Sequence, residues 1–70
     1  MSNLRELRIE AGLSIVKLAA LAGVDPATVQ HAETGKTTMN RLTARALTAA
    51  LSERLGRKIT IDDLGASVRT

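Results

Sequence analysis

Five glycines divide the chain into blocks of helical length, and this spacing constrains the fold more than any other feature of the sequence. They stand at Gly12, Gly23, Gly35, Gly56 and Gly65. Glycine often ends a helix, because it adopts the left-handed backbone conformation without a steric penalty. Each block is therefore expected to hold one short helix, and the chain to fold as an all-α, compact bundle of about five short helices.

Residues that cap helices predict where the first two helices begin. Ser2 or Asn3 is suited to the N-cap of the first helix, and Glu6, three residues after Asn3, completes a capping box. Ser14 occupies the equivalent place for a second helix, which is expected over residues 14–22. Apolar residues then recur at helical spacing, at Ile15, Leu18, Ala19 and Ala22.

The pair Asp25 and Pro26 indicates the start of a third helix over residues 26–34. An aspartate N-cap accepts hydrogen bonds from the first free amides, and proline is tolerated at the first helical position. Val29 and Ala32 then share one face of this helix, and we expect that face to be buried. The residues left exposed would be Ala27, Thr28, Gln30, His31 and Thr34.

The longest helix is predicted to begin at Thr38 or Asn40 and to end at Leu55. Its inward face is expected to consist of Leu42, Ala46, Leu47, Ala50, Leu51 and Leu55. Beyond Gly56, Thr60 as N-cap and Asp63 three residues later form a second capping box, which favours a last short helix. A brief strand over residues 59–61 is the alternative.

Composition excludes several kinds of site. The chain has no cysteine and one histidine, which excludes a disulfide framework, a thiolate metal site and a histidine metal cluster. No run approaches the roughly 18 apolar residues of a membrane span, so we expect a cytoplasmic protein. No nucleophilic cysteine or phosphate-binding glycine loop occurs in a chain too short to enclose a substrate, so neither an enzyme nor a cofactor is expected.

The charge of the chain is positive and unevenly distributed. A formal net charge of +3 and a sequence pI of about 10.2 favour an anionic partner. The full charges of residues 25–35 are acids, whereas the following segment is rich in cations, at Lys36, Arg41, Arg45, Arg54, Arg57 and Lys58. The last three and Arg45 lie along or beyond the long helix, where we expect them to be solvated or to pair with acids.

Two short helices joined by a glycine-containing turn are a candidate helix-turn-helix. The run LRELRIEAGLSIVKLAALAGVDPATVQHAETGK resembles the XRE family, also called the Cro/cI-type helix-turn-helix domains, and the likeness extends to about Leu64. The matching positions are Leu7, Arg8, the Gly12-Leu13-Ser14 turn, Leu18, Ala19, Gly23, Val24, Thr28, Val29, Glu33 and Gly35. The sequence departs from the family at Ile15, where the family usually offers glutamine to a phosphate, at Pro26, and at Thr34, where Asn-Gly-Lys is commoner.

The resemblance implies a lambda repressor-like DNA-binding domain whose third helix is the recognition helix and lies in the major groove. The base-reading residues would be Ala27, Thr28, Gln30 and His31, because glutamine pairs with adenine, and Ala and Thr touch thymine methyl groups. His31 would either donate to guanine or lie against a phosphate. Phosphate contacts would come from Ser14, Lys17, Thr34, Lys36, Thr37, Thr38, Asn40 and Arg41. The family also places an arginine of the first helix against an acid of the third, which here predicts an ion pair between Arg8 and Glu33.

One recognition helix reads only a few base pairs, so proteins of this type commonly dimerise on half-sites about one helical turn apart. The C-terminal part holds more apolar residues than a short tail needs, namely Leu55, Ile59, Ile61, Leu64 and Val68. They would form either a homodimer interface or the closure of the monomer core. Residues 1–66 are expected to form a single domain and residues 67–70 a frayed tail.

Two functions from different classes follow from these observations. The first is a sequence-specific regulator of transcription, a repressor that binds double-stranded DNA at an inverted repeat. The alternative is a protein-interaction module or antitoxin-type partner protein with weak or no DNA binding of its own. Phage or mobile-element repressors, restriction-modification controllers and antitoxins share this domain, so the sequence leaves the choice among them open.

Overall fold

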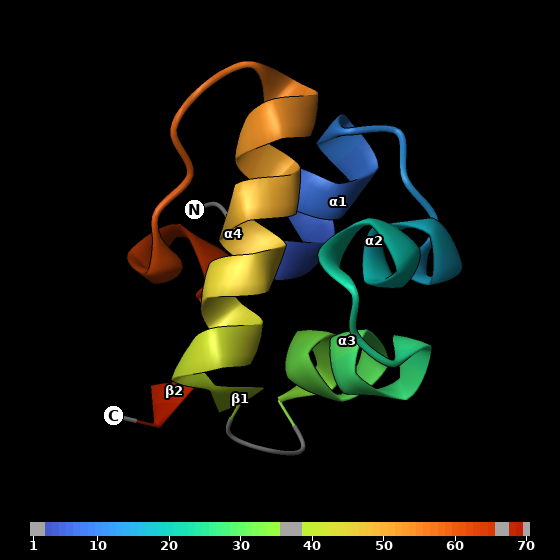
Figure 1. Cartoon of the computed structure of the whole chain (residues 1–70), viewed down its shortest axis with the longest axis vertical. Helices are drawn as coiled ribbons and strands as arrows, with labels where there is room; N and C mark the ends of the chain where they lie inside the picture. The colour runs from blue at the N-terminus through green and yellow to red at the C-terminus, as the bar shows by residue number, and fades with distance from the viewer. Residues whose placement is uncertain (1–2, 36–38, 66–67, 70) are drawn as a thin grey trace.

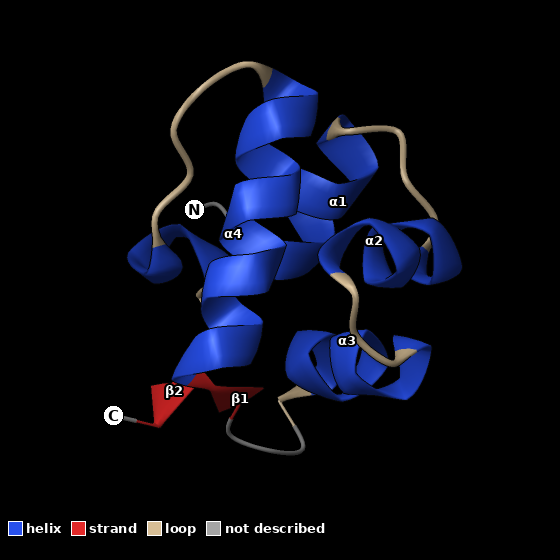
Figure 2. Ribbon diagram, viewed as in Figure 1, coloured by secondary structure: helices blue, strands red, loops and turns tan. Residues whose placement is uncertain are grey.

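The computed structural model describes residues 3–35, 39–65 and 68–69. Within them the chain forms four α-helices, one 3-10 helix and two strands of two residues each (Figure 1). In chain order these are α1 (Leu4–Glu10), α2 (Ile15–Ala22), α3 (Pro26–Thr34), β1 (Met39–Asn40), α4 (Arg41–Leu55), η1 (Ile61–Leu64) and β2 (Val68–Arg69). The predicted all-α bundle is confirmed, with η1 as the fifth and shortest helix (Figure 2).

The core lies around α4, which runs the length of the molecule (Figure 1). Helices α1 and α2 pack on one side of α4 and η1 on another, while α3 contacts α2 and α1. The largest side chains of this core that are fully buried are Leu4, Leu7, Leu18, Val29, Leu47, Leu51 and Leu64. A core without aromatic rings is thus built from branched aliphatic side chains on short helices that approach closely.

The first three helices begin at the predicted caps. Ser14 Oγ accepts a hydrogen bond from Lys17 N at 3.0 Å, and Asp25 Oδ1 accepts one from Ala27 N at 2.8 Å. Asn3 caps α1 in the same way, through Glu6 N at 2.9 Å. These bonds satisfy amides that have no partner within the helix, which is why short polar residues before an apolar repeat locate helix starts well.

Helix α4 buries most of the face that its sequence predicts, with Leu42 as the exception. Ala44, Leu47 and Leu51 are completely buried, whereas Leu42 is 79% exposed. Leu42 stands two positions before Ala44, about 200° around the helix, so the two side chains point in nearly opposite directions. The assignment of Leu42 to the inward face was therefore wrong, and the small Ala44 occupies the buried place instead.

The C-terminal apolar residues close the core of the monomer. Ile59 is 6% exposed and Leu64 is 1% exposed, so both are unavailable to the dimer interface predicted for them. Leu55 and Ile61 are partly buried against the same core, and the side chain of Val68 lies outside the described residues. Ser52 Oγ accepts a hydrogen bond from Ile59 N at 2.9 Å, which fixes this segment on α4. The predicted capping box of Thr60 and Asp63 is present and starts η1, in place of the alternative strand.

Two short strands connect distant parts of the chain. Strand β2 pairs in parallel with β1, with Met39 opposite Val68 and Asn40 opposite Arg69. A frayed tail was predicted over residues 67–70, but residues 68 and 69 form a strand. Residues 67 and 70 lie outside the described residues. The pairing supplies partners to backbone groups of β1, whose Met39 is buried.

Candidate nucleic-acid interface

Helices α2 and α3 form a helix-turn-helix at one edge of the molecule (Figure 1). The turn between them starts at Gly23, whose φ of 72° is left-handed, and Val24 N donates to Ala19 O at 2.9 Å. Val29 and Ala32 hold α3 in the core, as the helical spacing predicted. The opposite face of α3 is consequently turned away from the protein.

That outer face carries no Asp, Glu, Lys or Arg. Ala27, Gln30, His31 and Thr34 are exposed, and Thr28 is half-buried. Thr34 Oγ1 donates to Gln30 O at 3.1 Å and shares the same proton with His31 O at 3.2 Å. In this conformation Thr34 offers no free proton to a phosphate, whereas Gln30 and His31 make no side-chain hydrogen bond within the described part of the chain.

The acids of this segment are both engaged. Asp25 caps α3 through Ala27 N. Glu33 forms the predicted ion pair with Arg8, at 2.6 Å between Arg8 Nε and Glu33 Oε2 and 3.2 Å between Arg8 Nη2 and Glu33 Oε1. The Glu33 side chain is only 6% exposed, and that of Arg8 is 14% exposed. Within α3 itself the one acid is therefore Glu33, and it is paired with Arg8 and turned away from the outer face.

Arg8 makes a further contact that the sequence did not indicate. Its Nη1 donates to Leu13 O at 3.0 Å, in the turn between α1 and α2. One guanidinium thus joins the first helix, the turn before α2, and the end of α3. Side-chain bonds to a backbone carbonyl depend on tertiary placement, so no spacing in the sequence predicts them.

Apart from Thr34, the predicted phosphate-contacting residues fall into three groups. Asn40 and Arg41 are exposed at the start of α4, at the same end of the molecule as α3 and β1 (Figure 1). Ser14 is exposed at the start of α2, and Lys17 is exposed one turn further along. Lys36, Thr37 and Thr38 lie outside the described residues.

Two other cations are tied into the scaffold. Arg57 forms a bidentate ion pair with Glu10, at 2.6 Å and 3.2 Å, which joins the segment after α4 to α1. The hydrogen bond from Arg57 lowers the pKa of the Glu10 carboxyl, and the same bond raises the pKa of Arg57. Arg54 Nε donates to Ala11 O at 3.1 Å. These cations were expected either to be solvated or to pair with acids. Arg57 pairs with an acid.

Elsewhere, bonds from the Thr60 amide and hydroxyl lower the pKa of Asp63. This shift belongs to the capping box of η1.

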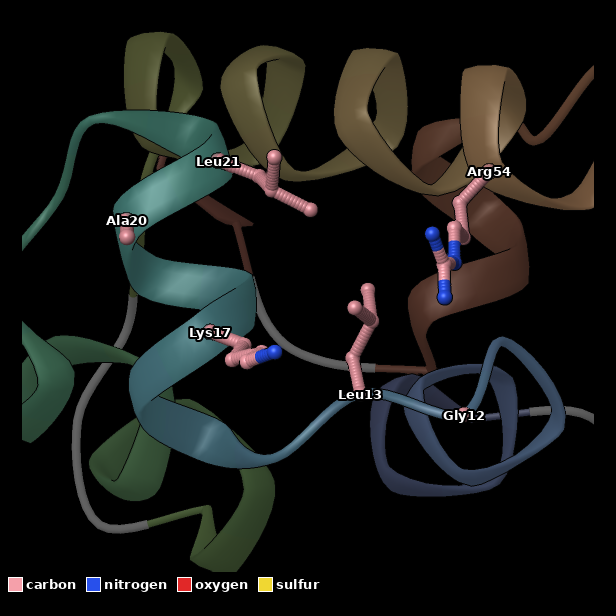
Figure 3. A pocket seen from close by; sticks show the side chains of 6 residues that line it. All are labelled: Gly12, Leu13, Lys17, Ala20, Leu21 and Arg54. Atoms are coloured by element: carbon pink, nitrogen blue, oxygen red, sulfur yellow. The ribbon is translucent and has the colours of Figure 1, made fainter.

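A hollow that the sequence did not predict lies on the other side of α2 (Figure 3). Its volume is about 350 Å³, and it is lined by Gly12, Leu13, Lys17, Ala20, Leu21 and Arg54. The Lys17 side chain shares this hollow with residues of α2, α4 and the turn before α2, and none of the lining residues belongs to α3.

Among the described residues, none of the helices is long and apolar enough to cross a membrane, and no cluster of side chains could hold a metal ion.

Comparison with known protein families shows to which family the helices α1 to α4 correspond. A family model described as Helix-turn-helix domain matches residues 2–57, which include α1, α2, α3 and α4. No curated protein and no solved structure matched the chain. The family is a class of non-enzymatic DNA-binding domains, and the match spans more than half of the chain, including the whole α2–turn–α3 unit. The chain therefore belongs to the helix-turn-helix domain family, in its XRE/Cro-like class.

Proposed function

We propose that this protein is a sequence-specific regulator of transcription, a repressor that binds double-stranded DNA with α3 in the major groove. The observation that carries the proposal is the outer face of α3. It has no Asp, Glu, Lys or Arg and is exposed except for the half-buried Thr28, while the acids at the two ends of the helix are engaged by Ala27 N and Arg8. A helix of this kind is able to approach base edges without repelling the phosphates on either side.

The residues that would read bases are Ala27, Thr28, Gln30 and His31. Gln30 has the amide geometry for adenine, and His31 has a ring N–H for guanine N7 or O6. Ala27 and Thr28, in the first turn of α3, are suited to thymine methyl groups. This set favours sites that contain A·T pairs.

Affinity would come from the neighbours of α3. Arg41 and Asn40 stand exposed at the start of α4, and Ser14 stands at the start of α2, where free amides favour an anion. Together with Lys36, Thr37 and Thr38, they would neutralise or bond phosphates on both sides of the groove. Lys17 and Thr34 remain secondary candidates, since Lys17 also lines the hollow and Thr34 bonds its own helix.

Two copies of the chain would bind the two halves of an inverted repeat. The requirement follows from the few base pairs that one recognition helix covers. Ile59 and Leu64 cannot join the copies, because they are buried in each monomer. Binding to adjacent half-sites is therefore expected to bring the copies together.

Selection from random duplex DNA at near-physiological salt tests this function. We expect an inverted repeat with half-site centres about one helical turn apart. His31→Ala and Gln30→Ala should each change the enriched sequence at one position of the half-site, whereas Lys58→Gln, an exposed cation beyond α4, should leave it unchanged. A folded protein that enriches no sequence would exclude the proposed reading role of α3 and leave the protein-interaction module as the better account.

A further inference from the structure

Two adjoining hollows lie between α2 and the C-terminal half of α4, and Figure 3 shows the one that extends to Gly12 and Leu13. Both are lined by Leu21 and Arg54. The hollow that was not described above has a volume of about 340 Å³, and Ala50 and Glu53 are its other lining residues. We refer to the two together as the α2–α4 groove, which is defined by the lining residues of both hollows.

The floor of the α2–α4 groove is apolar. Leu13 is buried beneath it, Ala50 is half-buried, and Leu21 is 60% exposed in its wall. An isolated exposed leucine is ordinary on a protein surface. Leu21, however, stands in a concave surface beside two cations, so a partner that covered it would also meet fixed charge.

The two cations of the groove point into the same space. Figure 3 shows the Lys17 amine and the Arg54 guanidinium directed into the space beside Leu13. The bond from Arg54 Nε to Ala11 O fixes the plane of the guanidinium. Within the described residues its two terminal nitrogens have no hydrogen-bond partner, and no acid lines the hollow that Lys17 shares with Arg54. A fixed guanidinium of this kind is suited to a carboxylate, which it binds through two parallel hydrogen bonds.

We propose that the α2–α4 groove docks a segment of a partner protein in which a carboxylate stands beside aliphatic side chains. The carboxylate binds Arg54 and Lys17, and the aliphatic side chains cover Leu21 and Ala50. Glu53 lines only the end of the groove that is formed by Leu21 and Ala50. Because its carboxylate repels another carboxylate, the acid of the partner is directed to the opposite end, where Lys17 lies. DNA phosphates would satisfy the cations but leave Leu21 uncovered, which favours a peptide over DNA. The proposal does not depend on α3 reading bases.

Randomised peptides displayed on phage are the probe that we would use. Selection on the wild-type protein should enrich peptides that share an Asp or Glu next to Leu, Ile or Val. We expect Leu21→Gln and Arg54→Gln each to weaken a selected peptide by about tenfold, a loss of about 1.4 kcal/mol. Val16→Gln is the matched control, because Val16 is a 63% exposed apolar residue of the same helix that lines neither hollow.

The same variants separate the groove from the DNA interface. Leu21→Gln should leave affinity for DNA unchanged, and DNA should not displace the peptide. Enriched peptides without acids, peptides insensitive to Leu21→Gln, or no enrichment on folded protein would each overturn the proposal. Displacement of the peptide by DNA, together with an equal loss of DNA affinity in Arg54→Gln, would assign the groove to DNA binding instead.

Discussion

Arg8 joins three segments of the fold through one guanidinium. Two of its nitrogens bind the Glu33 carboxylate, and the third donates to Leu13 O. Both side chains of the pair are largely buried, so loss of either would leave the other without an opposite charge where water has little access. We expect Glu33→Ala to lower the free energy of unfolding by about 3–5 kcal/mol, measured by urea denaturation.

A second ion pair in the protein provides the control. Glu10 and Arg57 bind with the same two distances, 2.6 Å and 3.2 Å, but their side chains are about half exposed. Because solvent replaces an exposed partner, Glu10→Ala should change stability far less than Glu33→Ala. Equal effects of the two substitutions would show that burial does not decide the strength of the Arg8–Glu33 pair.

Residue-scale contacts differed in how well the sequence predicted them. The Arg8–Glu33 pair was predicted only through the family resemblance, because no local spacing connects residues 25 positions apart. Nothing in the sequence indicated the hydrogen bonds from Arg8 to Leu13 O and from Arg54 to Ala11 O. Any carbonyl at a suitable distance can accept such a bond, so its position depends on the finished fold.

At the scale of elements, the turn between α2 and α3 depends on the backbone of Gly23. Its φ is 72°, and no atom lies within 4 Å of the place where a Cβ would stand. The cost of a side chain here is therefore conformational and not steric crowding by neighbours. Gly23→Ala should lower the free energy of unfolding by about 1–2 kcal/mol, measured by thermal or urea denaturation.

Substitution by asparagine distinguishes the two causes. Asparagine adopts the left-handed conformation more readily than alanine, so Gly23→Asn should cost less than Gly23→Ala. If the larger asparagine cost more, crowding in the turn would be the cause and the conformational argument would fail.

Helix boundaries followed from local chemistry, but the pairing of elements did not. Ser14, Asp25 and Pro26 located the starts of α2 and α3 to within a residue, because a cap acts on amides only two or three positions away. The strand pair of β1 and β2 involves two residues on each side, too few to show an alternating pattern. In α4, alanines and leucines are so frequent that more than one apolar face fits, which is why Leu42 was misplaced.

At the scale of the whole molecule, the C-terminal apolar residues complete a small core. A sequence without aromatic residues has few large side chains for this purpose, and Ile59 and Leu64 supply part of the missing volume. Composition alone could not separate this role from an interface, because both require apolar residues at the same positions. For Ile59 and Leu64, burial in the folded monomer identifies a role in the core.

The distribution of charge over the whole molecule predicts how its DNA affinity depends on salt. If phosphates are neutralised from the start of α4, the logarithm of the binding constant should fall linearly with the logarithm of salt concentration. Arg41→Gln should make this slope shallower by about 0.9, the value of one phosphate contact. Lys58→Gln removes the same charge from an exposed site beyond the other end of α4, so it should leave the slope unchanged. Fluorescence anisotropy with one duplex over a salt series measures both slopes. Equal changes in the two variants would mean that net charge, and not the position of Arg41 at the start of α4, governs the affinity.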